Sequence, residues 1–189
     1  DTWWDTGTWV TIQVWSTITQ VYLDEQTTNP SDSVNTPLTF AHVFWKWEIG
    51  STESIVLTDS NENLLETQVN KKATYDDGSL KHAIITTIIP NLANGEQAEL
   101  NIKKTATEQS NTAISFNELQ SANYDAEVIL TLSGVEYRAS AMDILWSAEE
   151  NKWIEWEMVT EWIWNAPFKD AEQNEHPHLQ ARFNVRWYR

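Results

Sequence analysis

The chain has 189 residues, which is enough for one large domain or for one domain and part of another. Its 28 acidic residues outnumber 12 basic residues, and the formal net charge of −16 argues against binding to nucleic acid or to an anionic membrane. Cysteine is absent, which excludes disulfides and thiolate metal sites, and no stretch has the length and apolar character of a membrane span.

The first predicted element is a strand near the N-terminus. Its apolar residues alternate with polar ones, a period of two that is typical of a half-buried strand. The apolar face carries Val10, Ile12, Val14 and Ile18, and the opposite face carries Thr11, Gln13, Thr17 and Thr19.

Tryptophan is unusually common, with 12 residues against five glycines. Trp9 and Trp15 lie on the polar face of the first strand, where an indole left in water is unfavourable. An exposed indole of this kind marks a contact with another subunit or a platform for a sugar ring. We therefore predict an interface or carbohydrate site at Trp9 and Trp15, together with Trp3 and Trp4.

The next predicted elements surround an acidic turn. Residues 24–37 are polar and are expected to form a loop, and residues 40–49 and 64–69 favour strands. The turn Asp76-Asp77-Gly78-Ser79 leads into residues 80–89, which are apolar on both faces and are therefore expected to form a strand buried on both sides. Pro90 is expected to end that strand.

The second half of the chain also favours strands. Residues 98–102 alternate, residues 126–132 and 135–139 predict a hairpin across Ser133-Gly134, and residues 154–164 and 179–187 predict two long strands. In the last two segments the alternation puts Trp156, Trp162, Trp164 and Trp187 in the core. The helical evidence is a capping box at Ser115–Glu118 and apolar spacing in residues 141–150.

Many short strands separated by turns predict an all-β fold, an antiparallel barrel or sandwich with the start of a second β-sandwich at the C-terminus. We expect three parts. Residues 1–35 form an N-terminal strand and linker that could be an assembly arm, residues 36–145 form the barrel, and residues 146–189 lead into the second sandwich.

Four segments resemble one known family. They begin at Pro37-Leu38-Thr39-Phe40, Ile55-Val56-Leu57, Asp77-Gly78-Ser79-Leu80-Lys81-His82-Ala83, and Val159-Thr160-Glu161-Trp162 with His178-Leu179-Gln180. Together they are similar to the N-terminal RIFT-barrel domain of exo-rhamnogalacturonan-lyase-like proteins, and similar modules look to occur in large phage virion and surface proteins. The resemblance implies a non-catalytic module, because the catalytic groups of the lyase-like members would lie in later domains.

The chain departs from the family pattern at three glycine positions. Trp47 and Trp156 stand where the pattern has glycine, and Ala41 replaces a third glycine. Glycine often marks a positive φ angle or a close backbone approach. The backbone at these positions therefore differs from that of the family, or the residues assigned there are not the native ones.

The residues supply little evidence for catalysis or cofactor binding. His176 and His178 could chelate a metal only if Glu175 or Asp170 converged on them, so they are weak candidates, and we predict no metal site and no cofactor. The acidic run Glu149, Glu150, Glu155, Glu157 and Glu161 is expected to be a solvated face. Ser79, His82 and Asp77 could be arranged as a triad on paper, but they lack nucleophile-elbow spacing.

We therefore expect a non-catalytic structural or interaction module of a larger extracellular or virion assembly. Its expected partners are other subunits of that assembly, with homo-oligomerisation favoured, and neither nucleic acid nor a membrane. The alternative is a carbohydrate-binding or substrate-positioning module of a polysaccharide lyase, with a glycan as partner.

Overall fold

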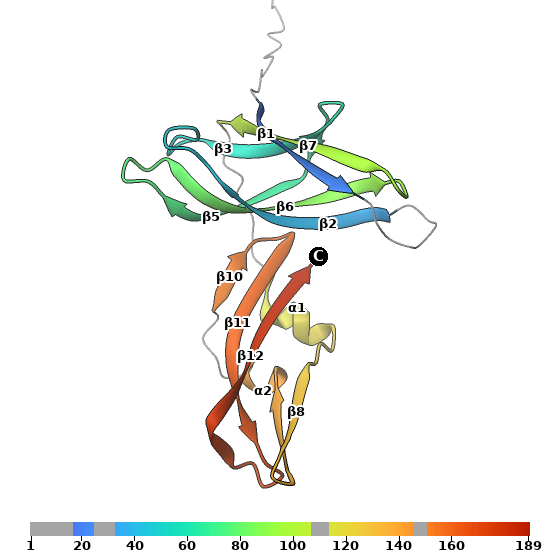
Figure 1. Cartoon of the computed structure of the whole chain (residues 1–189), viewed down its shortest axis with the longest axis vertical. Helices are drawn as coiled ribbons and strands as arrows, with labels where there is room; N and C mark the ends of the chain where they lie inside the picture. Colours follow the sequence, from blue (N-terminus) through green and yellow to red (C-terminus); the bar gives the residue numbers. More distant parts are fainter. Residues whose placement is uncertain (1–16, 25–32, 107–113, 146–150) are drawn as a thin grey trace, which may run out of the picture.

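The computed structural model describes residues 17–24, 33–106, 114–145 and 151–189. Over these residues the chain is built almost entirely of antiparallel strands, which confirms the predicted all-β fold. The strands form two bodies that follow one another along the long axis of the molecule (Figure 1). The first body contains β1 to β7, and the second contains β8 to β12 with two short helices.

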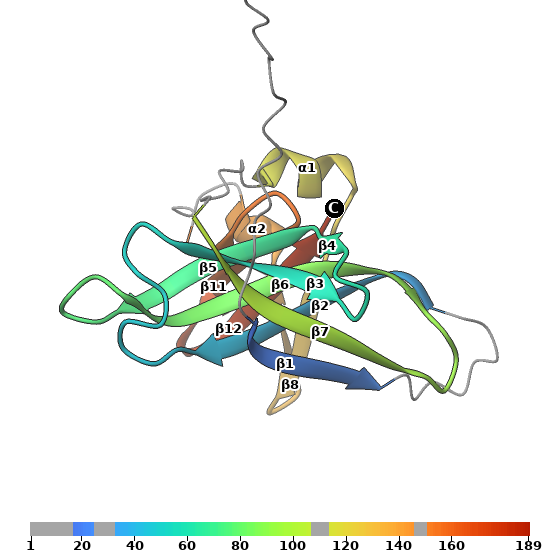
Figure 2. The same ribbon diagram turned by 90° about the horizontal axis from the view of Figure 1, so that it is seen from above.

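The first body consists of two sheets that face each other (Figure 2). One sheet has the order β1-β7-β3-β4 and the other has the order β2-β6-β5. Apolar side chains from both sheets fill the space between them, among them Ile55, Leu57, Ile85 and Ile102. The strands are β1 (Thr17–Asp24), β2 (Ser33–Val43), β3 (Ser54–Asp59), β4 (Leu64–Leu65), β5 (Thr67–Thr74), β6 (Leu80–Leu92) and β7 (Gln97–Thr105).

The acidic turn and the buried strand after it form as predicted. Gly78 has a φ angle of +83°, and β5 and β6 pair on either side of the turn. β6 is the central strand of its sheet and has most of its apolar residues buried. β6 continues past Pro90 to Leu92. Near Pro90 the strand pairs only with β2, and a strand with one open side tolerates a proline, which has no N–H.

The second body is built on a long antiparallel pair, β11 and β12, with the β8–β9 hairpin beside it. Trp162 and Trp164 are buried in its core, as the alternation predicts, while Trp156 and Trp187 are only partly buried. Its elements are α1 (Phe116–Ser121), β8 (Glu127–Leu132), β9 (Val135–Ser140), α2 (Met142–Leu145), β10 (Lys152–Glu155), β11 (Val159–Lys169) and β12 (Glu175–Tyr188).

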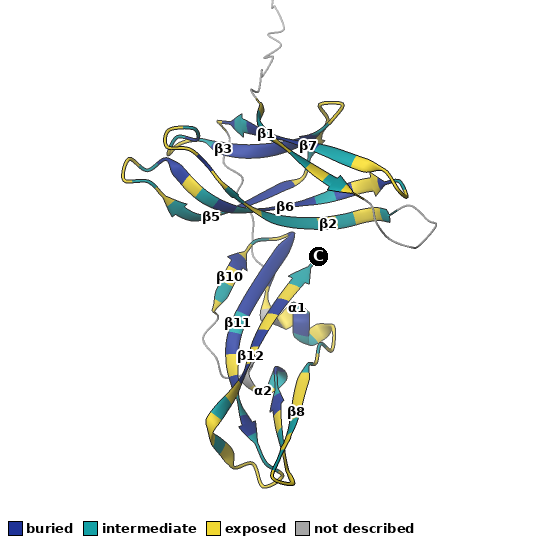
Figure 3. Cartoon of the chain, in the orientation of Figure 1, coloured by how far each residue is buried: buried dark blue, intermediate teal, exposed yellow. Residues whose placement is uncertain are grey.

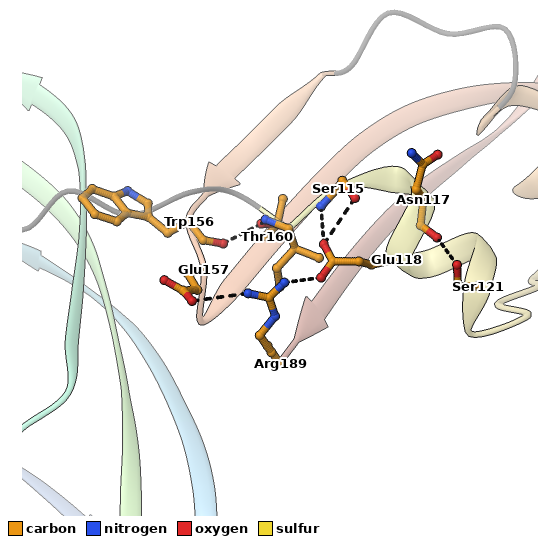
Figure 4. Close-up of polar contacts among 9 residues, drawn as sticks. Ser115, Asn117, Glu118, Ser121, Trp156, Glu157, Thr160 and Arg189 are labelled. Atoms are coloured by element: carbon orange, nitrogen blue, oxygen red, sulfur yellow. Dashed lines mark hydrogen bonds and ion pairs between the residues drawn. The ribbon is translucent and has the colours of Figure 1, made fainter.

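Local signals in the second body agree with the structure. Ser133 and Gly134 have φ angles of 50° and 82°, so both central residues of the hairpin turn are left-handed, as a type I′ turn requires. The capping box is present at the start of α1, where the Glu118 carboxylate accepts a hydrogen bond of 2.7 Å from the Ser115 N–H. Arg189 pairs with Glu118 and Glu157, and so ties the end of β12 to this helix (Figure 4).

The organisation of the chain differs from the prediction in several respects. β2 begins at Ser33 and ends at Val43, so residues 33–37 belong to a strand and not to the predicted loop, and the predicted strand over residues 40–49 is shorter. β1 pairs with β7 and belongs to the first body, whereas the β8–β9 hairpin belongs to the second, so the boundary falls between Thr105 and Ile114. The predicted strand over residues 154–164 is two strands, because the chain bends at residues 156–158 and Ile154 of β10 pairs with Glu161 of β11.

Gln68 joins the two bodies. Its side-chain amide, which is fully buried, donates to the Val159 carbonyl and accepts from the Val159 N–H, both at 3.1 Å. Val159 is the first residue of β11. The Gln68 side chain, which comes from β5, makes the two backbone hydrogen bonds there that a neighbouring strand would otherwise make. Thr39 and Tyr188 add a hydroxyl–hydroxyl hydrogen bond of 3.1 Å between the bodies.

We expect Gln68→Ala to lower the free energy of unfolding by about 2–3 kcal/mol, because it leaves a buried N–H and a buried carbonyl without their partner. Urea unfolding followed by circular dichroism measures this change. Gln97→Ala, which removes an exposed glutamine bonded to Asp24, is the matched control and should change the stability by less than about 0.5 kcal/mol. Equal effects of the two substitutions would contradict the role assigned to Gln68.

Candidate functional site

The strongest candidate is the segment between β2 and β3 formed by residues 44–50, which we call the tryptophan turn. Trp45 and Trp47 are 81% and 74% exposed, and they are the most exposed large apolar side chains in the described part of the chain. Exposed indoles two residues apart in one turn are costly in water and are characteristic of a contact surface.

Buried residues hold both ends of the tryptophan turn. Phe44 and Ile49 are core residues of the first body. The Phe44 N–H donates to the Lys81 carbonyl, and the Ile49 carbonyl accepts from the Leu80 N–H, each at 2.9 Å. The turn is therefore fixed to β6 on both sides, which limits the entropy lost when the indoles make a contact.

The acidic turn supports the tryptophan turn from the side. The Ser79 hydroxyl accepts from the Trp47 N–H at 3.2 Å and donates to the Asp77 carboxylate at 2.6 Å. Asp77 also accepts from the Ser79 N–H at 3.0 Å. These hydrogen bonds from Ser79 favour the ionised carboxylate and lower the pKa of Asp77.

Trp47 has a left-handed backbone, with a φ angle of +70°. This is the conformation that glycine adopts without steric cost, and a side chain makes it unfavourable by about 1–2 kcal/mol. Residue 47 is also a position where the resembled pattern has glycine. The backbone here keeps the conformation suited to glycine, while the residue carries an exposed indole.

Charged and aromatic groups lie at or near the tryptophan turn. The Lys46 ammonium lies 5.2 Å from the centre of the Trp47 ring, and the Lys81 ammonium lies 5.6 Å from the centre of the Tyr75 ring. The Tyr75 hydroxyl donates to the Phe44 carbonyl at 2.9 Å. Exposed indoles with charged and hydrogen-bonding groups on nearby residues suit contact with a protein surface or with the face of a sugar ring.

The arrangement does not provide a nucleophile. Ser79 is buried and its hydroxyl bonds directly to Asp77, so no imidazole lies between them. His82 lies in β6 and is not part of this network. The three residues therefore do not form the triad that could be drawn from the sequence.

The tryptophans singled out by the sequence lie elsewhere. Trp3, Trp4, Trp9 and Trp15 fall outside the described residues, so the interface predicted for them stays a prediction. Sequence reasoning missed Trp45 and Trp47 because residues 40–49 were expected to form one strand. The useful signal was the close spacing of two tryptophans immediately after a strand.

His176 has a structural role at the start of β12. Its Nδ1 atom accepts hydrogen bonds from the N–H groups of His178 and Leu179, at 3.2 and 3.1 Å. The ring also makes an edge contact with Tyr137. In the described ranges no three histidine, aspartate or glutamate side chains gather closely enough to hold a metal ion.

The acidic run near residue 155 is only partly solvated. Glu161 is buried and lies 2.5 Å from Arg186, which corrects the expectation for this residue. Glu157 pairs with Arg189 at 3.3 Å and Glu155 with Lys152 at 3.4 Å, whereas Glu149 and Glu150 lie outside the described residues. Figure 4 shows the Glu157–Arg189–Glu118 group, in which the guanidinium bridges two carboxylates.

No protein-family model, curated protein or solved structure matches the chain. Neither helix in the described part of the chain has the length and apolar character needed to cross a membrane.

We expect Trp47→Gly to raise the free energy of unfolding by about 1 kcal/mol, because it relieves the left-handed strain at this residue. Trp45→Gly is the matched control, since it removes an equally exposed indole from a residue without a positive φ angle. That control should lower the stability, because glycine adds freedom to the unfolded chain. Urea unfolding of both variants measures the difference, and destabilisation by both would contradict the assignment of strain.

The lowered pKa of Asp77 predicts a pH dependence. The folded pKa lies below the ordinary value of 3.8, so the ionised side chain stabilises the fold above that pH, and this contribution is lost as the pH falls through the folded pKa. Asp77→Asn should therefore reduce stability at pH 7 and have a smaller effect near pH 2.5. Unfolding titrations at several pH values, with Asp76→Asn as control, measure the change; a constant effect would contradict it.

Proposed function

We propose that the chain is a non-catalytic interaction module of a larger extracellular or virion assembly, and that the tryptophan turn packs on a neighbouring copy. The observation that carries this proposal is the exposure of Trp45 and Trp47, at 81% and 74%, on a backbone fixed by hydrogen bonds to β6 and to the acidic turn. Interfaces are enriched in such rigid aromatic anchors.

The composition supports the same proposal. A net charge of −16 keeps separate copies soluble, and an apolar contact is then needed to offset their repulsion. Charges at the turn are of both signs: Lys46 lies near Asp77, and the Glu48 carboxylate accepts a hydrogen bond from the Trp45 N–H. A neighbouring acidic copy can therefore approach this surface more easily than the rest of the molecule.

The resemblance to the RIFT-barrel domain of exo-rhamnogalacturonan-lyase-like proteins belongs to this proposal. The Asp77-Gly78-Ser79 turn that carries the resemblance is also the turn that supports Trp47, through the Ser79 hydroxyl. A module of this family placed in a virion or surface protein would present the turn as a contact surface, and this is the role we propose.

Sedimentation velocity over a range of concentrations tests the proposal. We expect the chain to self-associate, and the double variant Trp45→Ser with Trp47→Gly to associate more weakly. Loss of one interface anchor costs about 2 kcal/mol, or about thirtyfold in Kd. The control is Trp153→Ser, which removes an exposed indole of the second body that packs against Lys72. Unchanged association of the double variant would overturn the proposal.

A second candidate is binding of a glycan at the same surface. Two exposed indoles provide stacking faces for a sugar ring, and the Asp77 carboxylate, which is linked to the Trp47 backbone through Ser79, provides a hydrogen-bond acceptor for sugar hydroxyls. A glycan array probed with the wild-type chain separates the two functions. Specific binding that Trp45→Ser abolishes, in a chain that stays monomeric, would favour the glycan.

A further inference from the structure

β8 is an apolar strand at an open sheet edge. Val128, Ile129 and Val135 of the β8–β9 hairpin are 43%, 52% and 44% exposed, and the hairpin is largely exposed in Figure 3. Within the described ranges, β9 is the only strand that pairs with β8. Soluble proteins usually protect such an edge with lysine, proline or a bulge, because it invites another strand. Residues 128–132 contain none of these protections.

The register shows which backbone groups face the open edge. Leu132 pairs with Val135 across the two-residue turn, so these two residues exchange both backbone hydrogen bonds. The pairs Leu130–Tyr137 and Val128–Ala139 do the same, because such pairs alternate along an antiparallel ladder. The N–H and carbonyl groups of Ile129 and Thr131 therefore point away from β9. An added strand could bond to them without disturbing the hairpin.

The side chains next to this edge also lack cover. Leu130 and Tyr137 of the β8–β9 hairpin pack against the core of the second body but are only partly buried. A strand placed beside β8 would extend the same face if it carried apolar residues at alternate positions.

The N-terminal segment of the chain has that pattern. Val10, Ile12 and Val14 alternate with Thr11 and Gln13. If this segment paired with β8, Val10, Ile12 and Val14 would extend the sheet face that carries Val128 and Leu130. Trp9 and Trp15 would then lie on the opposite face, which carries Ile129. Residues 128–132 and 10–14 both carry apolar side chains at their first, third and fifth positions.

Charge favours this occupant over a second β8. Residues 6–16 carry no charged side chain, so the segment adds no like charge at an acidic protein. Pairing of β8 with another β8 would instead add a strand that carries the Glu127 carboxylate.

The occupant must come from another copy. Trp15 precedes Thr17, the first residue of β1, by two residues, which span about 7 Å when extended. β1 and β8 lie toward opposite ends of the long axis (Figure 1). A strand that ends so close to β1 cannot also lie along the β8 of its own chain.

We propose that residues 8–15 of one copy add as a strand to the open edge of β8 in the next copy. This deepens the proposed function, on which it rests, by naming a second contact and its partner. The contact joins different surfaces of the two copies, so repetition produces a ring or an open string of subunits. It is a β-augmentation in which backbone hydrogen bonds supply affinity and the alternating side chains set the register.

Cross-linking of the full chain tests the proposal. The protein has no cysteine, so Gln13→Cys and Ile129→Cys each introduce a single thiol. A short bis-maleimide should join the two variants when they are mixed and should join neither variant to itself. Thr131→Pro in the Ile129→Cys chain removes an outward N–H and should reduce the yield at least tenfold, whereas Thr131→Ala should not. Circular dichroism checks that every variant is folded.

Each outcome decides the question. A cross-link within Ile129→Cys alone would replace the proposal by β8–β8 pairing, and one within Gln13→Cys alone would replace it by pairing between N-terminal segments. Absence of any cross-link would also overturn it. If the Trp45→Ser with Trp47→Gly variant still weakens association in that case, the proposed function stands and only the strand addition fails.

Discussion

The buried amide of Gln68 is the contact on which the arrangement of the two bodies depends. It satisfies both backbone groups of Val159 at the start of β11, at a position that is fully buried. Glutamine is required at this position. An apolar side chain has no donor or acceptor, and the shorter side chain of asparagine could not reach both backbone groups of Val159. The contact fixes where the second body begins relative to the first.

The tryptophan turn is also held in one conformation by its surroundings. A surface that is ordered in advance loses less conformational entropy in any contact it makes. Here Ser79 links the Trp47 backbone to the Asp77 carboxylate, and Phe44 and Ile49 hold the ends of the turn in the core. The strained φ angle of Trp47 is tolerated because the surrounding contacts determine the backbone there.

Sequence patterns anticipated the elements whose causes are local. The strand after the acidic turn, the Ser133-Gly134 hairpin and the capping box at Ser115 depend on nearby residues, and all three form. Assignment of the β8–β9 hairpin to the second body could not be predicted, because it depends on pairing between distant strands. Gln68 gave no signal either, since a glutamine in an alternating strand is normally read as solvent-facing.

The position of β1 has a mechanical consequence. β1 is at the end of its sheet and is held by one neighbour, β7, through a ladder that runs from Thr17 to Asp24. A pull on the N-terminal segment would fall on this ladder before it reached the interior of either body. Within one molecule, β1 is therefore the strand that such a pull would detach first, because a single ladder holds it to the first body.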